Sequence, residues 1–101
     1  MNLSQNKIVT MLQFAYCARK LFFGESVIVK MMANKIKVMV LATDVSTTQE
    51  NKYLSKAEFY NIKVVRLFTK LELASLFNKN EVACVGISDE NMAKQIIKLA
   101  E

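Results

Sequence analysis

Apolar residues along the chain follow two spacings that alternate from one end to the other. Helical spacing of apolar positions predicts helices over residues 4–20, 25–34, 46–60, 69–77 and 88–100. Short, nearly continuous apolar runs predict strands over residues 21–23, 36–43, 62–68 and 82–87. Strands that alternate with helices of this length form a sheet between two helical layers. The sequence therefore predicts an α/β fold, a three-layer α-β-α sandwich with a four-stranded sheet.

Polar residues refine the expected arrangement. Lys63 and Arg66 interrupt the third strand run and place it nearer an edge, whereas the second and fourth runs are apolar on both faces. Thr69 and Glu72 form a T-x-x-E capping box at the start of the fourth helix. The second helix carries its apolar residues on one face, at Val27, Ile28, Met31 and Met32.

Composition sets the size and class of the protein. The chain has 101 residues, of which 52% are hydrophobic, enough for one packed core and a single domain over residues 1–101. No apolar run is long enough to cross a bilayer, and the first residues lack the apolar stretch of a secretory signal. We therefore expect a compact, soluble protein of the cytoplasm.

Side chains suited to catalysis are scarce. Histidine is absent, so no imidazole can act as an acid, a base or a metal ligand. Cys17 and Cys84 lie 67 positions apart, and we expect two free, largely buried thiols instead of a disulfide or a zinc site. Gly24 and Gly86 belong neither to the dinucleotide-binding pattern nor to a P-loop. The sequence predicts no enzyme, no metal site and no cofactor.

Two acids stand where open α/β sheets place their sites, because Asp44 and Asp89 each follow a predicted strand. Such acids could bind Mg²⁺ or accept a phosphoryl group, as in a receiver domain. That fold needs an acidic cluster after its first strand, where this chain has only Glu25. The competing interpretation is that both acids cap helices, Asp44 beside Val45 and Ser46 and Asp89 at the last helix.

The net charge of +5 is concentrated in the first part of the chain. Residues 44–101 carry eight basic and eight acidic side chains, whereas residues 1–43 carry one acid and six basic residues. A one-sided basic field indicates a polyanion as partner, with RNA or DNA first and an anionic membrane second. The alternative is a solvated basic surface that keeps the protein soluble.

Gly24 separates the short first strand from the second helix. A glycine there permits a positive φ or the close approach of another molecule, and the helix that follows presents free amides to an anion. Five cations lie near it in the sequence, at Arg19, Lys20, Lys30, Lys35 and Lys37. We expect these cations to converge on the helix entrance and form a platform for a phosphodiester backbone.

Several segments resemble a known family. Residues 17–30, CARKLFFGESVIVK, resemble the segment A-R-K-x-x-x-G-x-x-x-x-x-K of bacterial YlxQ-type proteins. The likeness continues through residues 37–46, 60–64, 69–73 and 82–87, and so covers essentially the whole chain. These proteins belong to the ribosomal-protein superfamily that binds RNA kink-turns, typified by the archaeal large-subunit protein L-seven-Ae.

The resemblance implies a three-layer α-β-α sandwich that recognises kinked RNA through two segments. The turn and helix after the glycine correspond here to Gly24, Ser26, Val27 and Lys30. The loop before the last strand corresponds to Asn78, Lys79, Asn80, Glu81 and Val82. The family pattern G-x-N-E-x-x-K has Ser26 and Val27 here in place of Asn and Glu. That Glu normally accepts hydrogen bonds from base edges.

From residues and resemblance together we expect a non-enzymatic domain that recognises kinked or looped RNA by its shape. Its expected setting is ribosomal RNA or the translation machinery. Phosphates would be held by backbone amides at Gly24 and Ser26 and by the side chains of Lys30, Lys35 and Lys37. Val27 and Val82 would cover exposed bases. The alternative is a protein–protein adaptor of the same fold that lost RNA contact through the change at positions 26 and 27.

Overall fold

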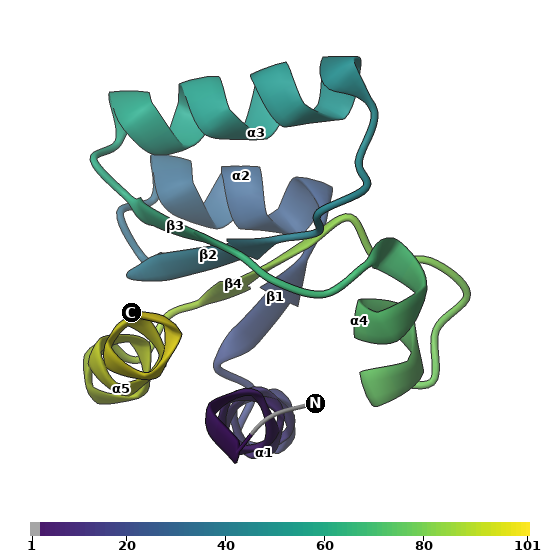
Figure 1. Ribbon diagram of the computed structural model, residues 1–101. Coiled ribbons are helices and arrows are strands. Elements are labelled where there is room, and N and C mark those ends of the chain that lie inside the picture. The colour runs from purple at the N-terminus through teal and green to yellow at the C-terminus, as the bar shows by residue number, and fades with distance from the viewer. Residues whose placement is uncertain (1–2) are drawn as a thin grey trace.

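The computed structural model describes residues 3–101 and confirms the predicted order of helices and strands (Figure 1). The elements are α1 (Leu3–Cys17), β1 (Leu21–Phe23), α2 (Glu25–Met32), β2 (Val38–Leu41), α3 (Thr47–Phe59), β3 (Lys63–Arg66), α4 (Lys70–Leu76), β4 (Cys84–Ile87) and α5 (Glu90–Ala100). Three of the strands are shorter than their apolar runs, because residues such as Ile36 and Val82 are buried beside the sheet without joining it.

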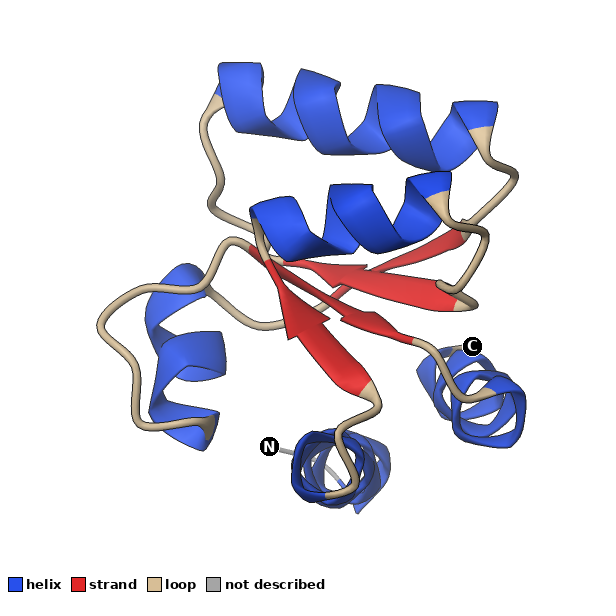
Figure 2. Cartoon of the chain, turned by 180° about the vertical axis from the view of Figure 1, so that it is seen from behind, coloured by secondary structure: helices blue, strands red, loops and turns tan. Residues whose placement is uncertain are grey.

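The four strands form one mixed sheet in the order β1-β4-β2-β3. β2 and β3 are parallel, whereas β4 runs antiparallel to both of its neighbours, β1 and β2. The helices α2 and α3 cover one face of the sheet, and α1, α4 and α5 lie on the other (Figures 1 and 2). This confirms the three-layer sandwich, with β3 at an edge as the charged residues predicted.

Because β1, β2 and β3 all point the same way, the sheet has two distinct ends. We call the end where these strands finish and β4 begins the carboxyl edge; it includes Gly24, Thr43 and the loop 77–83. We call the opposite end the amino edge; it includes Lys20, Lys37 and the turn after β4. The helices α2, α3 and α4 therefore begin at the carboxyl edge, on the right of Figure 1.

Two hydrophobic clusters fill the spaces on the two sides of the sheet. The cluster under α1, α4 and α5 includes Ile8, Leu12, Leu73 and Ile96. The cluster under α2 and α3 includes Val27, Met31, Tyr53 and Cys84. Side chains of β2 alternate between them, which is why this central strand is apolar on both faces.

Gly86 lets α2 lie close to the sheet. A Cβ atom on Gly86 would stand 2.9 Å from Cγ1 of Val27 and 3.0 Å from Cδ1 of Ile36. Both distances are well inside ordinary van der Waals contact, so a side chain here would have to displace its neighbours. The absent side chain on β4 thus makes room for the first turn of α2.

The two acids each accept a hydrogen bond at the start of a helix. Asp89 accepts a hydrogen bond from the Met92 amide at 2.9 Å and caps α5, and Asp44 accepts one from the Lys70 amide at 2.8 Å at the start of α4. The capping interpretation is therefore confirmed for Asp89. It is wrong for Asp44, because Ser46 caps the helix that follows it and Asp44 contacts the start of α4, far away in the sequence. The predicted capping box of Thr69 and Glu72 is present on the same helix.

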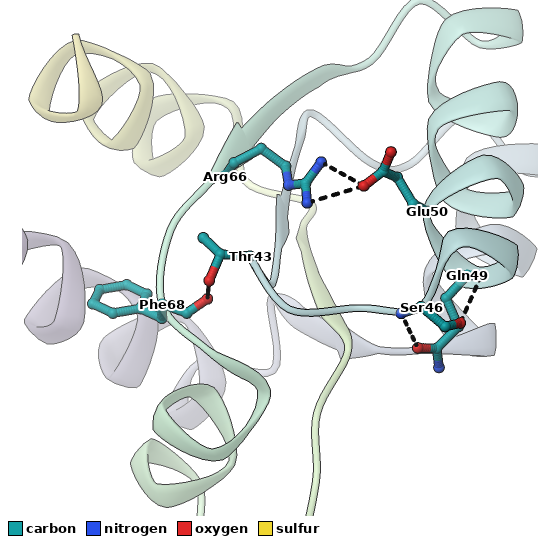
Figure 3. A network of polar contacts seen from close by, with 6 residues as sticks. All are labelled: Thr43, Ser46, Gln49, Glu50, Arg66 and Phe68. Atoms are coloured by element: carbon teal, nitrogen blue, oxygen red, sulfur yellow. Dashed lines mark hydrogen bonds and ion pairs between the residues drawn. The ribbon is translucent and has the colours of Figure 1, made fainter.

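Polar contacts also cap α3 and join it to the edge strand β3 (Figure 3). Ser46 and Gln49 form a reciprocal capping box at the start of α3. The Arg66 guanidinium of β3 contacts Oε2 of Glu50 at 3.3 Å.

None of the helices in residues 3–101 has the length and apolar character needed to cross a membrane.

Candidate functional site

The entrance to α2 differs from those of the three helices that follow it. Gly24 has a φ of 51° and a ψ of −124°, and no side chain caps this helix. The helices α3, α4 and α5 are each capped by a side-chain oxygen. Since the first amides of a helix have no acceptor within it, the amides of Glu25 and Ser26 remain available to an external anion. Positive φ at this turn explains why glycine precedes the helix.

One acid stands at this entrance, and a lysine from the neighbouring helix compensates it. Glu25 lies in the first turn of α2 and forms an ion pair with Lys52 of α3. Ser26 is exposed beside it. The charges of the Glu25 carboxylate and the Lys52 ammonium largely cancel. The α2 amides therefore lie beside an ion pair with little net charge.

The loop between α4 and β4 lies next to the α2 entrance. The Gly24 amide donates to the carbonyl of Cys84, the first residue of β4, at 3.2 Å. Asn78, which follows the C-cap residue of α4, has a φ of 56°, and Glu81 pairs with Lys70 at 3.1 Å. The two segments that the resemblance singled out therefore meet at the carboxyl edge.

Two lysines from these segments bracket the edge strand β1. Nζ of Lys30 lies 5.1 Å from the centre of the Phe22 ring, and Nζ of Lys79 lies 4.5 Å from the centre of the Phe23 ring. Phe23 also makes edge-to-face contacts with Tyr16 and Phe77, which fix its ring in place. Each ammonium is thus positioned by an aromatic ring.

Sequence reasoning missed these aromatic residues. The run Phe22-Phe23 indicated only a short strand, although two adjacent aromatic residues before a glycine lie on opposite faces of that strand. The sequence signal that could have indicated Lys30 is its position on the helix that covers the Phe22 face of the strand. Lys79 comes from a distant part of the chain, and only the fold places it there.

The expected convergence of five cations on the α2 entrance is wrong. Lys30 lies in the last turn of α2, away from its first residue. The Lys20 carbonyl accepts from the Ser88 amide at 2.9 Å, and the Lys37 amide donates to the Ile87 carbonyl at 2.8 Å. Both contacts are at the far end of β4 from Cys84, about 10 Å away along the strand. The cations placed at the amino edge are Arg19, Lys20, Lys35 and Lys37. They are near Gly24 in sequence, but β1 and α2 each cross the sheet and separate them from it.

The expected contact of two valines with bases is also wrong. Val27 is 0% exposed and Val82 is 3% exposed. Val27 faces the sheet because it belongs to the apolar stripe of α2 and packs at Gly86. Val82 enters the cluster on the opposite side of the sheet just before β4 begins. Neither side chain can reach a ligand without unpacking the core.

A buried thiol and phenol lie beneath the turn at Gly24. Tyr53 is 4% exposed, and its hydroxyl oxygen is 3.9 Å from the position a Cβ on Gly24 would occupy. Burial raises the pKa of the Cys84 thiol from 9.0 to about 12. Burial, with smaller contributions from Cys84 and Glu25, raises the pKa of Tyr53 from 10.0 to about 12. Cys84 is therefore a structural thiol at neutral pH.

Cys17 differs from the sequence-based expectation, since it is exposed while Cys84 is buried, and both are free. At pH 8 we expect a thiol reagent such as Ellman's reagent to modify Cys17 rapidly and Cys84 only after denaturation. A Cys17→Ser variant, used as the control, should then show no rapid phase. A rapid phase in that variant would contradict the burial of Cys84.

The same two groups predict a decline of stability in alkali. The unfolded chain releases the protons of Cys84 and Tyr53 near their ordinary pKa values of 9.0 and 10.0, whereas the folded protein holds them until about pH 12. The contribution of these groups is therefore complete below pH 9 and is lost as the pH rises towards 12. Urea unfolding at several pH values would measure this, and Cys84→Ala should flatten the lower part of the curve.

Comparison with known proteins identifies the family. The model of the Ribosomal protein L7Ae/L30e/S12e/Gadd45 family matches residues 6–97. The chain belongs to this family. It is 27% identical to the RNA-binding protein YlxQ of Enterococcus faecium over 97% of this chain and 95% of that protein. It is 25% identical to the RNA-binding protein YlxQ of Bacillus subtilis over 90% of this chain and 92% of that protein.

Solved structures share the L7Ae-type fold over nearly the whole length. A protein of unknown function from Bacillus halodurans C superposes with a TM-score of 0.87 at 24% identity, covering 93% of this chain and 96% of that chain. The 15.5kD RNA binding protein of Giardia lamblia superposes with a TM-score of 0.77 at 10% identity, covering 99% of this chain and 87% of that chain. At these identities the likeness concerns the fold.

Proposed function

We propose that this protein binds structured RNA through the carboxyl edge of its sheet. The observation that carries the proposal is membership of the L7Ae family, together with the two relatives named as RNA-binding proteins. The geometry supports the same edge, since the uncapped entrance of α2 and the loop around Lys79 lie side by side there. The proposed ligand is kinked or looped RNA, with ribosomal RNA or the translation machinery as its setting.

The proposed mechanism is recognition of a bent phosphate backbone. The amides at Glu25 and Ser26 hold one phosphate at the positive end of α2. Lys30 and Lys79, on either side of β1, hold phosphates on two further sides of the bend. Their rings limit the freedom of the ammonium groups before RNA arrives, which lowers the entropic cost of binding.

Base reading contributes less in this proposal than phosphate binding. The position of the family's Glu is held by the buried Val27, which offers no acceptor to a base edge. The exposed side chains of Ser26, Asn78 and Asn80 are the remaining polar groups of the two segments that can meet a base or sugar. Glu81 is paired with Lys70 and orients the loop.

The proposal is tested by titrating the protein against a kink-turn RNA and an unkinked duplex of equal length at two salt concentrations. We expect tighter binding to the kinked RNA, with an affinity that falls as salt rises for both RNAs. Equal affinity for the two would contradict recognition by shape. Binding to neither RNA at the lower salt would contradict the proposed function and favour the adaptor alternative.

A further inference from the structure

The amino edge of the sheet collects cations from three separate segments of the chain. They come from the turn between α1 and β1, the turn between α2 and β2, and the first residue of β3: Arg19, Lys20, Lys35, Lys37 and Lys63. All five residues are exposed. In Figure 1 this edge lies where β2 and β3 begin and β4 ends.

Strand register places three of these lysines next to one another. Ile87 of β4 pairs with Leu21 on one side and with Val38 on the other, and Val38 in turn pairs with Lys63. Lys20 and Lys37 each come directly before a member of this row. Neighbouring strands are about 4.8 Å apart, so the three lysine backbones span roughly 15 Å across the edge.

Within the described residues, the acidic side chains form no ion pair with the amino-edge cations. In the part of the chain from residue 3 onward, the ion pairs involve Lys52, Arg66, Lys70 and Lys94, and none of the five amino-edge cations. Of the acids that follow β4, Asp89 caps α5 and Glu90 pairs with Lys94, while the exposed Glu101 lines the same hollow as Lys63. Glu58, exposed near the end of α3, is the remaining acid on the helix that leads into this edge.

Compensation of helix dipoles does not account for the cluster. The dipole of a helix acts on charges in its last turn, and α1, α2 and α3 all end at this edge. The basic residues in the last turns are Lys30 in α2 and Lys56 in α3, and α1 has none. Lys35 and Lys37 lie three and five residues beyond the end of α2, where this effect has faded.

We propose that the amino edge is a second phosphate-binding surface, which holds a further segment of RNA while the carboxyl edge holds the bend. This inference rests on the proposed function and adds a second contact, at the opposite end of the sheet. The surface has exposed ammonium and guanidinium groups, which bind the phosphodiester backbone without regard to sequence. The segment comes from an extended arm of the same RNA or from a second RNA molecule.

Two triple variants with equal charge locate this contact. The amino-edge variant replaces Lys20, Lys35 and Lys37 with glutamine, and the control variant replaces Lys7, Lys94 and Lys98, which lie on α1 and α5. Each lowers the net charge from +5 by the same three charges. Because all six lysines are exposed, both variants should keep the fold, which circular dichroism checks.

Each protein is titrated over a range of salt with a short kink-turn RNA and with the same RNA carrying one lengthened helical arm. For the unaltered protein we expect a steeper salt dependence with the longer RNA, by about two to three units of slope. The amino-edge variant should lose this difference, while the control variant keeps it. Equal behaviour of the two variants would overturn the inference, whereas failure of the unaltered protein to prefer the kinked RNA would overturn the proposed function.

Sedimentation with the short RNA in excess distinguishes the two sources of the segment. A complex of two RNAs with one protein, absent in the amino-edge variant, indicates a second molecule. A complex of one RNA with one protein, combined with the steeper slope for the longer RNA, indicates an arm of the same molecule. A one-to-one complex without any effect of the arm would contradict the second surface in both forms.

Discussion

Replacing Val27 with glutamate is expected to lower the free energy of unfolding by about 3 kcal/mol or more. The substitution restores the acid of the family pattern, but the side chain here is 0% exposed and lies where α2 touches Gly86. A carboxylate at this position loses its hydration and gains no cation or amide in return. Urea unfolding followed by circular dichroism measures the loss, which should shrink at low pH, where the carboxylate takes up a proton.

The matched control lies one residue earlier on the same turn. Ser26→Asn restores the other half of the family pattern at an exposed position, and its effect on stability should stay within about 0.5 kcal/mol. If Val27→Glu were tolerated equally well, the first turn of α2 would have to be looser than its contact with Gly86 indicates. The expected result means that base contacts through this acid cannot be regained by a single substitution.

At Val27, the helical spacing of apolar residues and the family resemblance predicted different surroundings, and the spacing was correct. The helical spacing of Val27, Ile28 and Met31 predicted that these residues share the face that packs on the sheet, and all three are buried. The resemblance implied instead that position 27 meets RNA. A glutamate and a valine at the same turn need different surroundings, so the position could not be carried over once the residue type had changed. Met32, predicted on the same face, is 63% exposed because α2 ends there.

Local interactions made the helices and strands predictable, whereas the direction of β4 determines which cations lie near Gly24. Capping boxes and apolar spacing depend on residues a few positions apart, and the box of Thr69 and Glu72 is present as predicted. The distance between Gly24 and Lys37 depends on how β4 lies between β1 and β2, which involves residues more than forty positions away. Nothing in the spacing of the first 43 residues determines that arrangement.

Lys30 and Lys79 are the lysines that we expect to contribute most to RNA affinity. Lys30→Met together with Lys79→Met should weaken binding to a kink-turn RNA by about 30- to 150-fold at physiological salt, since each lost phosphate contact is worth roughly 1–1.5 kcal/mol. Methionine keeps an apolar stem against Phe22 and Phe23 and removes the charge, so packing on the two rings is preserved. The slope of log affinity against log salt should fall by about two units.

A double variant of equal charge, Lys94→Met with Lys98→Met on α5, provides the comparison. These lysines lie in the layer of α1 and α5, away from the α2 entrance, and we expect a slope reduced by less than one unit and an affinity within about threefold of the unaltered protein. Equal losses in the two double variants would mean that the protein attracts RNA only through its overall charge. A loss confined to Lys30 and Lys79 would instead require RNA to contact both sides of β1 at once, which only a backbone that bends around that strand can do.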